Sequence, residues 1–138
     1  MSFTASARHA GSGLRHEVDV NGRHVLVTDE PASLGGTDTG PAPHELLPAA
    51  LAACISTMIA LYAQRKEWDL GEVQVDVEYD HESEPRRFDV AVRLPAGLSP
   101  DQIARLESVA RTCPVRRALE AGSVFDERIV TADPAHAS

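Results

Sequence analysis

The sequence predicts a single α+β domain, and three observations support that class. Residues 46–63 carry no formal charge, which predicts one long apolar helix. Residues 14–28 and 73–92 contain alternating apolar and polar side chains, which indicate antiparallel strands before and after that helix. Strands and helices do not alternate as in a Rossmann-type fold. We expect one domain over residues 1–138, ordered from about 3 to 130.

Composition narrows the possible functions. The chain has 138 residues, 43% of them apolar and 25% charged, which is typical of a globular domain with its own core. Its net charge of −8 argues against binding to nucleic acid or to an anionic membrane surface. The first residues show no secretory signal, so we expect a cytoplasmic protein whose two cysteines stay reduced.

The N-terminal segment predicts three strands and a loop. Residues 3–8 alternate loosely and predict a first strand. Residues 14–20 and 23–28 flank Asn21-Gly22, the residue pair that favours a type I′ turn, so they predict a hairpin. Residues 29–43 predict a loop, because glycine and proline concentrate in their second half.

The expected two-residue turn also fixes which side chains share a face. Val18 and Val20 point to one side of the hairpin, and Val25 and Val27 are expected to join them. This face would be the apolar one.

The central helix is predicted to begin at residue 43 or 44 and to end at 66 or 67. Pro48 fits only in a first turn or at a kink, because it lacks an N–H. The uncharged run is long enough for a membrane span, but its many alanines, Ser56 and Thr57 make a span unfavourable. We therefore expect a buried core helix and no membrane association.

The second half of the chain predicts two strands, two helices and a last strand. Residues 73–77 and 88–92 alternate around a polar turn at 81–86. Ser99-Pro-Asp-Gln102 forms a capping-box pattern, and the helix that follows is expected to turn one face inward. That face comprises Ile103, Leu106, Val109, Ala110 and Cys113.

Pro114 ends this helix and can start the next one, which covers 115–121 and stops at Gly122. Residues 124–130 predict a final strand, and the tail 131–138 is expected to be loose.

Two cysteines are the candidate reactive groups. Cys54 lies in the middle of the apolar helix, where burial would raise its pKa unless a cation or hydrogen-bond donor faces it. Cys113 directly precedes Pro114, so it would lie at a helix N-terminus, where an anion is favoured. Both residues are also compatible with purely structural roles. They are 59 positions apart, so only the fold can bring them together.

Other catalytic patterns are weak. His44 and Glu45 precede Cys54 by ten and nine residues, about 14–15 Å along a straight helix, so contact would need a kink at Pro48. The six histidines and two cysteines show no metal-ligand spacing. Residues 35–40 do not follow a strand in a βαβ unit, so we do not expect a nucleotide site.

Two segments of the chain resemble the OsmC/Ohr family, the osmotically inducible and organic-hydroperoxide-resistance proteins. The first covers residues 35–54, with the sequence GGTDTGPAPHELLPAALAAC, and the second covers 113–119, CPVRRAL. Each contains one of the two cysteines, and the expected element order fits over about residues 3–130. The Pro-x-Glu-Leu-Leu start and the Cys-Pro-Val motif are most similar to the generic OsmC-like branch.

The resemblance implies a fold and an activity. The fold is an intertwined homodimer, with curved antiparallel sheets wrapped around long central buried helices. The activity is reduction of hydroperoxides, preferably organic ones, with Cys54 as the reactive thiol and Cys113 as the resolving thiol. Their disulfide would be reduced by a dithiol of the lipoyl or thioredoxin type. The family uses no metal, flavin or other cofactor.

The chain departs from the family pattern around the reactive cysteine. Family members bracket that cysteine with an Arg and a Glu, and the Glu lies ten residues before it, at the position of His44. Glu45 is one residue later, a rotation of about 100° on a helix. The expected cation can come from Arg15 or Arg23 of the hairpin, or from Arg116 or Arg117 after Cys113; the sequence leaves these open.

Two functional hypotheses follow. The first is a thiol peroxidase, in which the pKa of Cys54 is lowered and the thiol pairs with Cys113. The alternative is a non-catalytic OsmC-fold protein that binds a small molecule or responds to redox state, with thiols that titrate near 8.5 or above.

Overall fold

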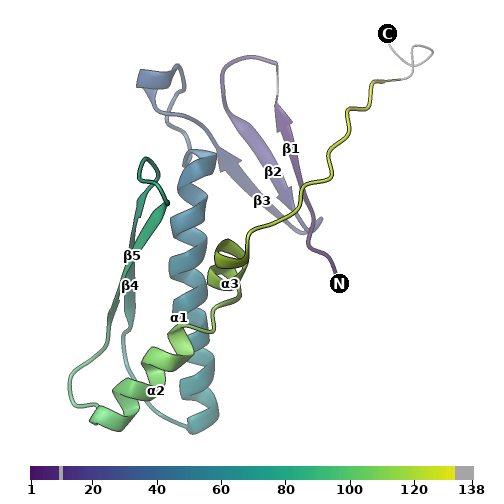
Figure 1. The fold of residues 1–138 in the computed structure, drawn as a ribbon. Helices are drawn as coiled ribbons and strands as arrows, with labels where there is room; N and C mark the ends of the chain where they lie inside the picture. The colour runs from purple at the N-terminus through teal and green to yellow at the C-terminus, as the bar shows by residue number, and fades with distance from the viewer. Residues whose placement is uncertain (10, 133–138) are drawn as a thin grey trace.

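A computed structural model describes residues 1–9 and 11–132 and confirms the α+β class. Two antiparallel sheets lie on different sides of one long helix (Figure 1). The strands and helices in chain order are β1 (Ala5–His9), β2 (His16–Val20), β3 (His24–Thr28), η1 (Ala32–Leu34), η2 (Pro43–Glu45), α1 (Leu46–Lys66), β4 (Gln74–Asp80), β5 (Arg87–Arg93), α2 (Pro100–Ala110) and α3 (Pro114–Ala121).

The N-terminal sheet has the order β1-β2-β3, and the predicted hairpin is confirmed. Asn21 and Gly22 have φ values of 55° and 67°, the left-handed conformation that Asn and Gly tolerate best. The Arg23 N–H donates to the Val20 carbonyl at 3.1 Å and closes the turn. The turn nevertheless contains a third residue, Arg23, because Val20 pairs with His24.

This extra residue overturns the expected grouping of the valines. Val18 pairs with Leu26, whereas Val25 and Val27 pair with the acidic residues of β2, Asp19 and Glu17. A shift of one residue moves every side chain of a strand to the other face. Val25 and Val27 therefore lie on the face opposite Val18 and Val20, and Val25 is 63% exposed.

Asp29 anchors the loop that leads to the central helix, a role that the sequence analysis missed. Its side chain is buried and accepts hydrogen bonds from the hydroxyls of Thr37 and Thr39, both at 2.6 Å. The backbone N–H groups of Glu30 and Thr39 donate to it at 2.8 and 3.1 Å. Together these hydrogen bonds hold the pKa of Asp29 well below its usual range. The bonds from the Thr37 and Thr39 side chains contribute most to this lowering.

The central helix α1 is confirmed, and it buries only one face. Leu51, Ile55, Ile59 and Ala63 recur every four residues and form the centre of the core. The opposite side has no charged residue and remains uncovered along much of its length. We call this the outer face of α1; its exposed members are Leu47, Ala50, Ala53, Thr57 and Leu61.

Length and composition alone would allow the helix over Pro43–Lys66 to cross a membrane, but the core helix of a soluble protein meets the same criteria. Its four buried residues pack against β4, α2 and α3, which is the behaviour of a core helix.

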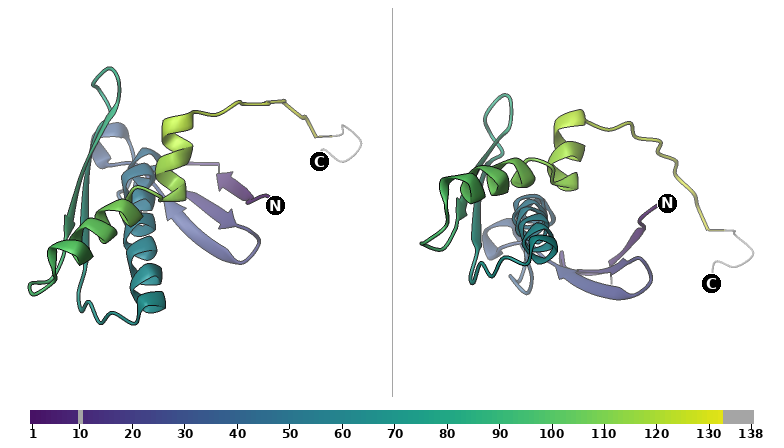
Figure 2. Two further views of the ribbon diagram at one scale, coloured as in Figure 1. Left: turned by 60° about the horizontal axis from the view of Figure 1, so that its bottom comes forward. Right: turned by 90° about the horizontal axis from the view of Figure 1, so that it is seen from below.

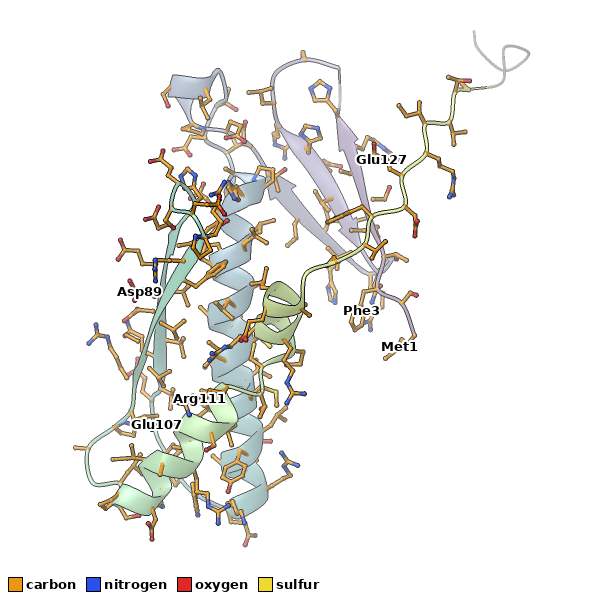
Figure 3. The ribbon with its side chains drawn as sticks, in the orientation of Figure 1. Met1, Phe3, Asp89, Glu107, Arg111 and Glu127 are labelled. Carbon is orange, nitrogen blue, oxygen red and sulfur yellow. The ribbon has the colours of Figure 1, made fainter. Side chains whose placement is uncertain are left out.

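The second sheet and the two short helices cover the inner face of α1. In the β4–β5 hairpin, Val77 pairs with Val90, and Tyr79 pairs with Phe88 on the apolar face. Asp89 lies on the other face of this sheet and points away from α1 (Figure 3). The capping box at Ser99 is confirmed, since Ser99 and Gln102 exchange hydrogen bonds at 3.1 and 2.9 Å.

The expected inner face of α2 is confirmed in part. Leu106 is 1% exposed, whereas Ile103 remains 38% exposed.

The predicted strand over residues 124–130 is wrong. Residues 122–132 form an extended arm that leaves the body of the molecule without pairing to a strand (Figure 1). Val124, Phe125 and Ile129 are 90%, 88% and 90% exposed. The apolar pattern suits a strand, but a strand exists only where a second one supplies hydrogen-bond partners. The tail over residues 131–138 was predicted to be loose, and its residues 133–138 lie outside the part of the chain that the structure describes.

The single chain is far from compact. It exposes 10827 Å² of surface, whereas a compact monomer of 14.8 kDa would expose about 7000 Å². The N-terminal sheet projects to one side of α1 instead of packing against the β4–β5 sheet, and the arm extends further still (Figure 2). Much apolar surface, including the outer face of α1, therefore lacks a cover within the described part of one chain.

Candidate active site

The fold brings the two cysteines into contact. Cys54 lies in α1, half-buried, and Cys113 lies between α2 and α3 with none of its surface exposed. Both are free thiols, and the side chain of Cys113 is within hydrogen-bonding reach of Cys54. Packing of α2 and α3 on the inner side of α1 produces this contact across 59 positions of sequence.

The position of Cys113 follows from the local sequence. Pro114 ends the preceding segment and occupies the first position of α3, which makes Cys113 the N-cap residue. The Arg116 N–H donates to the Cys113 sulfur at 3.5 Å. The backbone N–H of Val115 is directed to Cys54. The N-terminus of α3 therefore supplies one donor to each sulfur.

The electrostatic state of Cys54 differs from the expectation for a reactive thiol. Burial raises the pKa of Cys54, and the contact with Cys113 raises it further. The hydrogen bond from the Val115 N–H lowers the pKa of Cys54, but the pKa remains above its ordinary value. Within one chain, the predicted lowering of this pKa is therefore not observed.

None of the four candidate arginines is among the groups that shift the pKa of Cys54 within the described chain. Arg15 pairs with Glu17 at 3.9 Å on the exposed N-terminal sheet, and Arg23 is exposed in the β2–β3 turn. The Arg116 side chain pairs with Glu120 at 2.5 Å, and Arg117 is exposed on α3. The structure thus brings the two cysteines together without bringing a guanidinium to Cys54.

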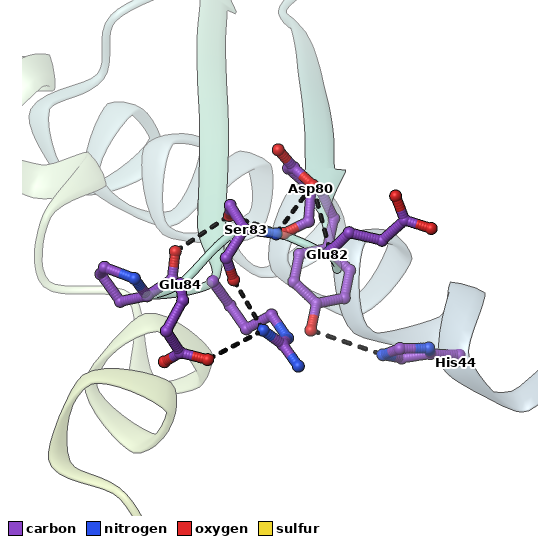
Figure 4. A network of polar contacts seen from close by, with 8 residues as sticks. His44, Asp80, Glu82, Ser83 and Glu84 are labelled. Carbon is purple, nitrogen blue, oxygen red and sulfur yellow. Dashed lines mark hydrogen bonds and ion pairs between the residues drawn. The ribbon is translucent and has the colours of Figure 1, made fainter.

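His44 and Glu45 do not join the cysteines either. The His44 ring contacts the Tyr79 hydroxyl at 3.4 Å (Figure 4) and packs edge-on against His81, with ring centroids 5.2 Å apart. Glu45 accepts a hydrogen bond from the backbone N–H of Ala42 at 2.9 Å, which stabilises the start of the helix. Any catalytic role of Glu45 stays a prediction.

An apolar cavity lies next to the two cysteines in the fold. It has a volume of about 310 Å³ between α1, β5 and α3. Its walls include Leu51, one turn before Cys54, and Arg116, one turn after Cys113. Phe88, Val90 and Leu119 complete the apolar part of the lining, and Glu120, the ion-pair partner of Arg116, also lines the cavity. Neither sulfur lines the cavity directly.

Comparison with known proteins identifies the family. The model of the family described as OsmC-like protein matches residues 36–128, which include both cysteines. The chain therefore belongs to the OsmC-like protein family, as the resemblance in its two motifs predicted. A search of curated proteins finds no match.

Solved structures with the same fold include proteins connected with stress and peroxides. A putative osmotic stress induced and detoxification response protein from Psychrobacter arcticus is 26% identical, with a TM-score of 0.70 over 85% of this chain and 87% of that one. An organic hydroperoxide resistance protein from Legionella pneumophila is also 26% identical, with a TM-score of 0.58 over 86% and 89%. A putative organic hydroperoxide resistance protein from Vibrio cholerae, with captopril in one active site, is 26% identical, with a TM-score of 0.59 over 86% and 84%.

Proposed function

We propose that the chain is a cysteine-based peroxidase that reduces organic hydroperoxides. The observation that carries the proposal is the contact between Cys54 and Cys113, the only two cysteines of the sequence. A reactive thiol with a second thiol beside it can pass from sulfenic acid to disulfide without a large rearrangement. The hydroperoxide resistance proteins from Legionella pneumophila and Vibrio cholerae support the substrate class.

The difference in burial between the two thiols supports a division of roles. Cys54 is half-buried and so is accessible to a peroxide, whereas Cys113 is fully enclosed and can react only with its neighbour. Cys54 therefore takes the reactive role and Cys113 the resolving one. The apolar cavity of about 310 Å³ beside them suits an alkyl or aryl group better than hydrogen peroxide. A dithiol of the lipoyl or thioredoxin type would restore the thiols, in the cytoplasm.

The proposed enzyme is a homodimer. The surface in excess of a compact monomer is about 3800 Å² per chain, or about 7600 Å² for two copies, which is more than enough to supply the roughly 2000–5000 Å² in total that stable dimers bury. The uncovered outer face of α1 and the apolar C-terminal arm are the surfaces that a second copy would cover. Arg15 and Arg23 lie on the projecting N-terminal sheet, so in a dimer they can approach the cysteines of the other copy.

Two observations favour a second candidate, a non-catalytic redox-responsive protein of the same fold. The pKa of Cys54 is raised, and His44 occupies the position of the family Glu and faces Tyr79. A thiol that stays protonated at neutral pH reacts slowly with peroxides. Such a protein would form the same disulfide, but too slowly for turnover.

Peroxide consumption separates the two candidates. Reduced protein with dihydrolipoamide should consume cumene hydroperoxide over many turnovers, and faster than hydrogen peroxide. The Cys54→Ser variant should lose this activity, whereas Ser56→Ala, a matched change on the other side of α1, should retain it. A wild-type protein that is oxidised once but does not turn over would favour the redox-responsive candidate. Unchanged consumption by Cys54→Ser would overturn the peroxidase proposal.

A further inference from the structure

A second cavity lies at the start of α1, apart from the two cysteines. It has a volume of about 330 Å³ and lies between the loop after β3, the first turn of the central helix and the tip of the β4–β5 hairpin. Neither cysteine lines it. We propose that this cavity is a binding site for a small planar organic cation of the amidine or guanidine type. The site is independent of the proposed peroxidase activity.

Aromatic rings from two parts of the chain form one wall of the cavity. The His44 ring of η2 packs edge-on against Tyr79 at the end of β4, with ring centroids 5.3 Å apart, and against His81, at 5.2 Å (Figure 4). Tyr79 is stacked on Phe88 of β5 at 4.3 Å, which fixes the wall to the sheet. Aromatic rings attract cations, and a wall that is in place before binding costs little entropy to use.

Two carboxylates supply the charge that a cation requires. Glu30 follows β3 and is half-buried, and Glu45 lies in η2. One oxygen of Glu45 accepts the Ala42 N–H at 2.9 Å, which leaves its second oxygen available. Within residues 1–9 and 11–132, neither glutamate forms an ion pair, and no lysine or arginine lines the cavity. The negative charge of the cavity is therefore not neutralised by this part of the chain, and a cation complements it.

The remaining lining is apolar and limits the size of the ligand. It comes from Pro31, Leu34, Ala42 and Pro48, and Leu34 is 66% exposed in the single chain. A volume of about 330 Å³ is at the low end for small-molecule sites, which suits one ring with a cationic group. An amidinium can donate two parallel N–H bonds to a carboxylate while its ring lies against the apolar side.

Binding of benzamidine to the reduced, full-length protein tests the proposal. Isothermal titration calorimetry at about pH 8 and low salt gives the affinity, and three related probes serve as comparisons. Benzamide has the same shape without the charge, benzoate reverses the charge, and acetamidine keeps the cation without the ring. We expect benzamidine to bind with a Kd of about 1 mM or lower, and each of the other probes to bind at least about tenfold more weakly.

Two double variants separate the cavity from the overall charge of the protein. Glu30→Gln combined with Glu45→Gln removes both carboxylates, and glutamine at the helix start can still form the capping hydrogen bond. Glu72→Gln combined with Glu107→Gln removes the same charge at exposed positions outside the cavity. We expect the first pair to weaken benzamidine binding by at least about tenfold, and the second pair by less than about twofold.

Backbone amide NMR locates the bound probe. Benzamidine should shift the signals of residues 30–48 and 79–81 more than those of the rest of the chain. Shifts centred on another surface, equal affinity for benzamide, or unchanged binding in the cavity variant would each overturn the inference. The same holds if benzamidine does not bind at all, including the case in which a second copy of the chain seals the cavity.

The outcome can be told apart from a failure of the proposed function. None of these measurements uses a peroxide or a turnover, and all of them can be repeated on Cys54→Ser. A protein without peroxidase activity that still binds benzamidine in this cavity would retain this inference, and an active peroxidase that does not bind it would lose only this inference.

Discussion

Replacement of Leu61 by Glu should break the proposed dimer. Leu61 lies on the outer face of α1 and is 46% exposed in the single chain. Covering this remaining surface, roughly 80 Å², stabilises the assembly by about 2 kcal/mol per copy. Two copies give about 4 kcal/mol, or about a thousandfold in the dimer dissociation constant. The introduced carboxylates would also lose their water, which adds several kcal/mol.

Sedimentation equilibrium and thermal unfolding at several concentrations measure this effect. The wild type should be dimeric at micromolar concentration, with a melting temperature that rises with concentration. Leu61→Glu should be monomeric or unfolded under the same conditions. Ala104→Glu is the control, because Ala104 is exposed on α2 beside the charged residues Glu107 and Arg111.

In a chain that acts as a monomer, Leu61→Glu would change stability by no more than about 0.5 kcal/mol. A variant with unchanged mass and unchanged melting temperature would therefore refute the reasoning.

Two further predictions concern the core and the anchored loop. Leu106→Ala should lower the free energy of unfolding by about 2–5 kcal/mol in urea titrations, because Leu106 is 1% exposed at the contact of α2 with the core; a loss below about 1 kcal/mol would contradict this packing. The folded-state pKa of Asp29 lies below its unfolded value, so its stabilising effect is present above about pH 4 and is lost as pH falls further. Asp29→Asn should therefore flatten the acid side of the stability profile, and an unchanged slope would speak against the role of the Thr37 and Thr39 hydroxyls.

Local sequence signals predicted most elements because their physical causes are local. The capping box at Ser99 and the Asn21-Gly22 turn form from residues close in sequence, and both are present. The uncharged run over 46–63 could be recognised as a core helix without knowing its neighbours. The hairpin register failed by one residue, because Arg23 joined the turn and no sequence signal distinguishes the two turn lengths here.

Predictions that depended on contacts with a distant segment of the chain were less successful. Residues 124–130 have the apolar pattern of a strand, but their exposure shows that pattern alone does not supply a pairing edge. His44 was expected at a helix start, and its contact with Tyr79 and His81 required the β4–β5 hairpin to fold beside it. The Asp29 network was missed because its threonine donors lie eight and ten residues away within a loop.

The amino-acid sequence by itself determined the order of the elements, the membership in the OsmC-like family and the identity of the two cysteines. These properties depend on short motifs and on periodicity, which any stretch of chain carries with it. Only the tertiary structure decided that Cys54 and Cys113 meet, that α3 directs its N–H groups to them, and that no guanidinium of the described chain reaches Cys54. Contacts across 59 residues arise from the packing of α2 and α3 on α1, and no local pattern encodes the distance between two sulfurs.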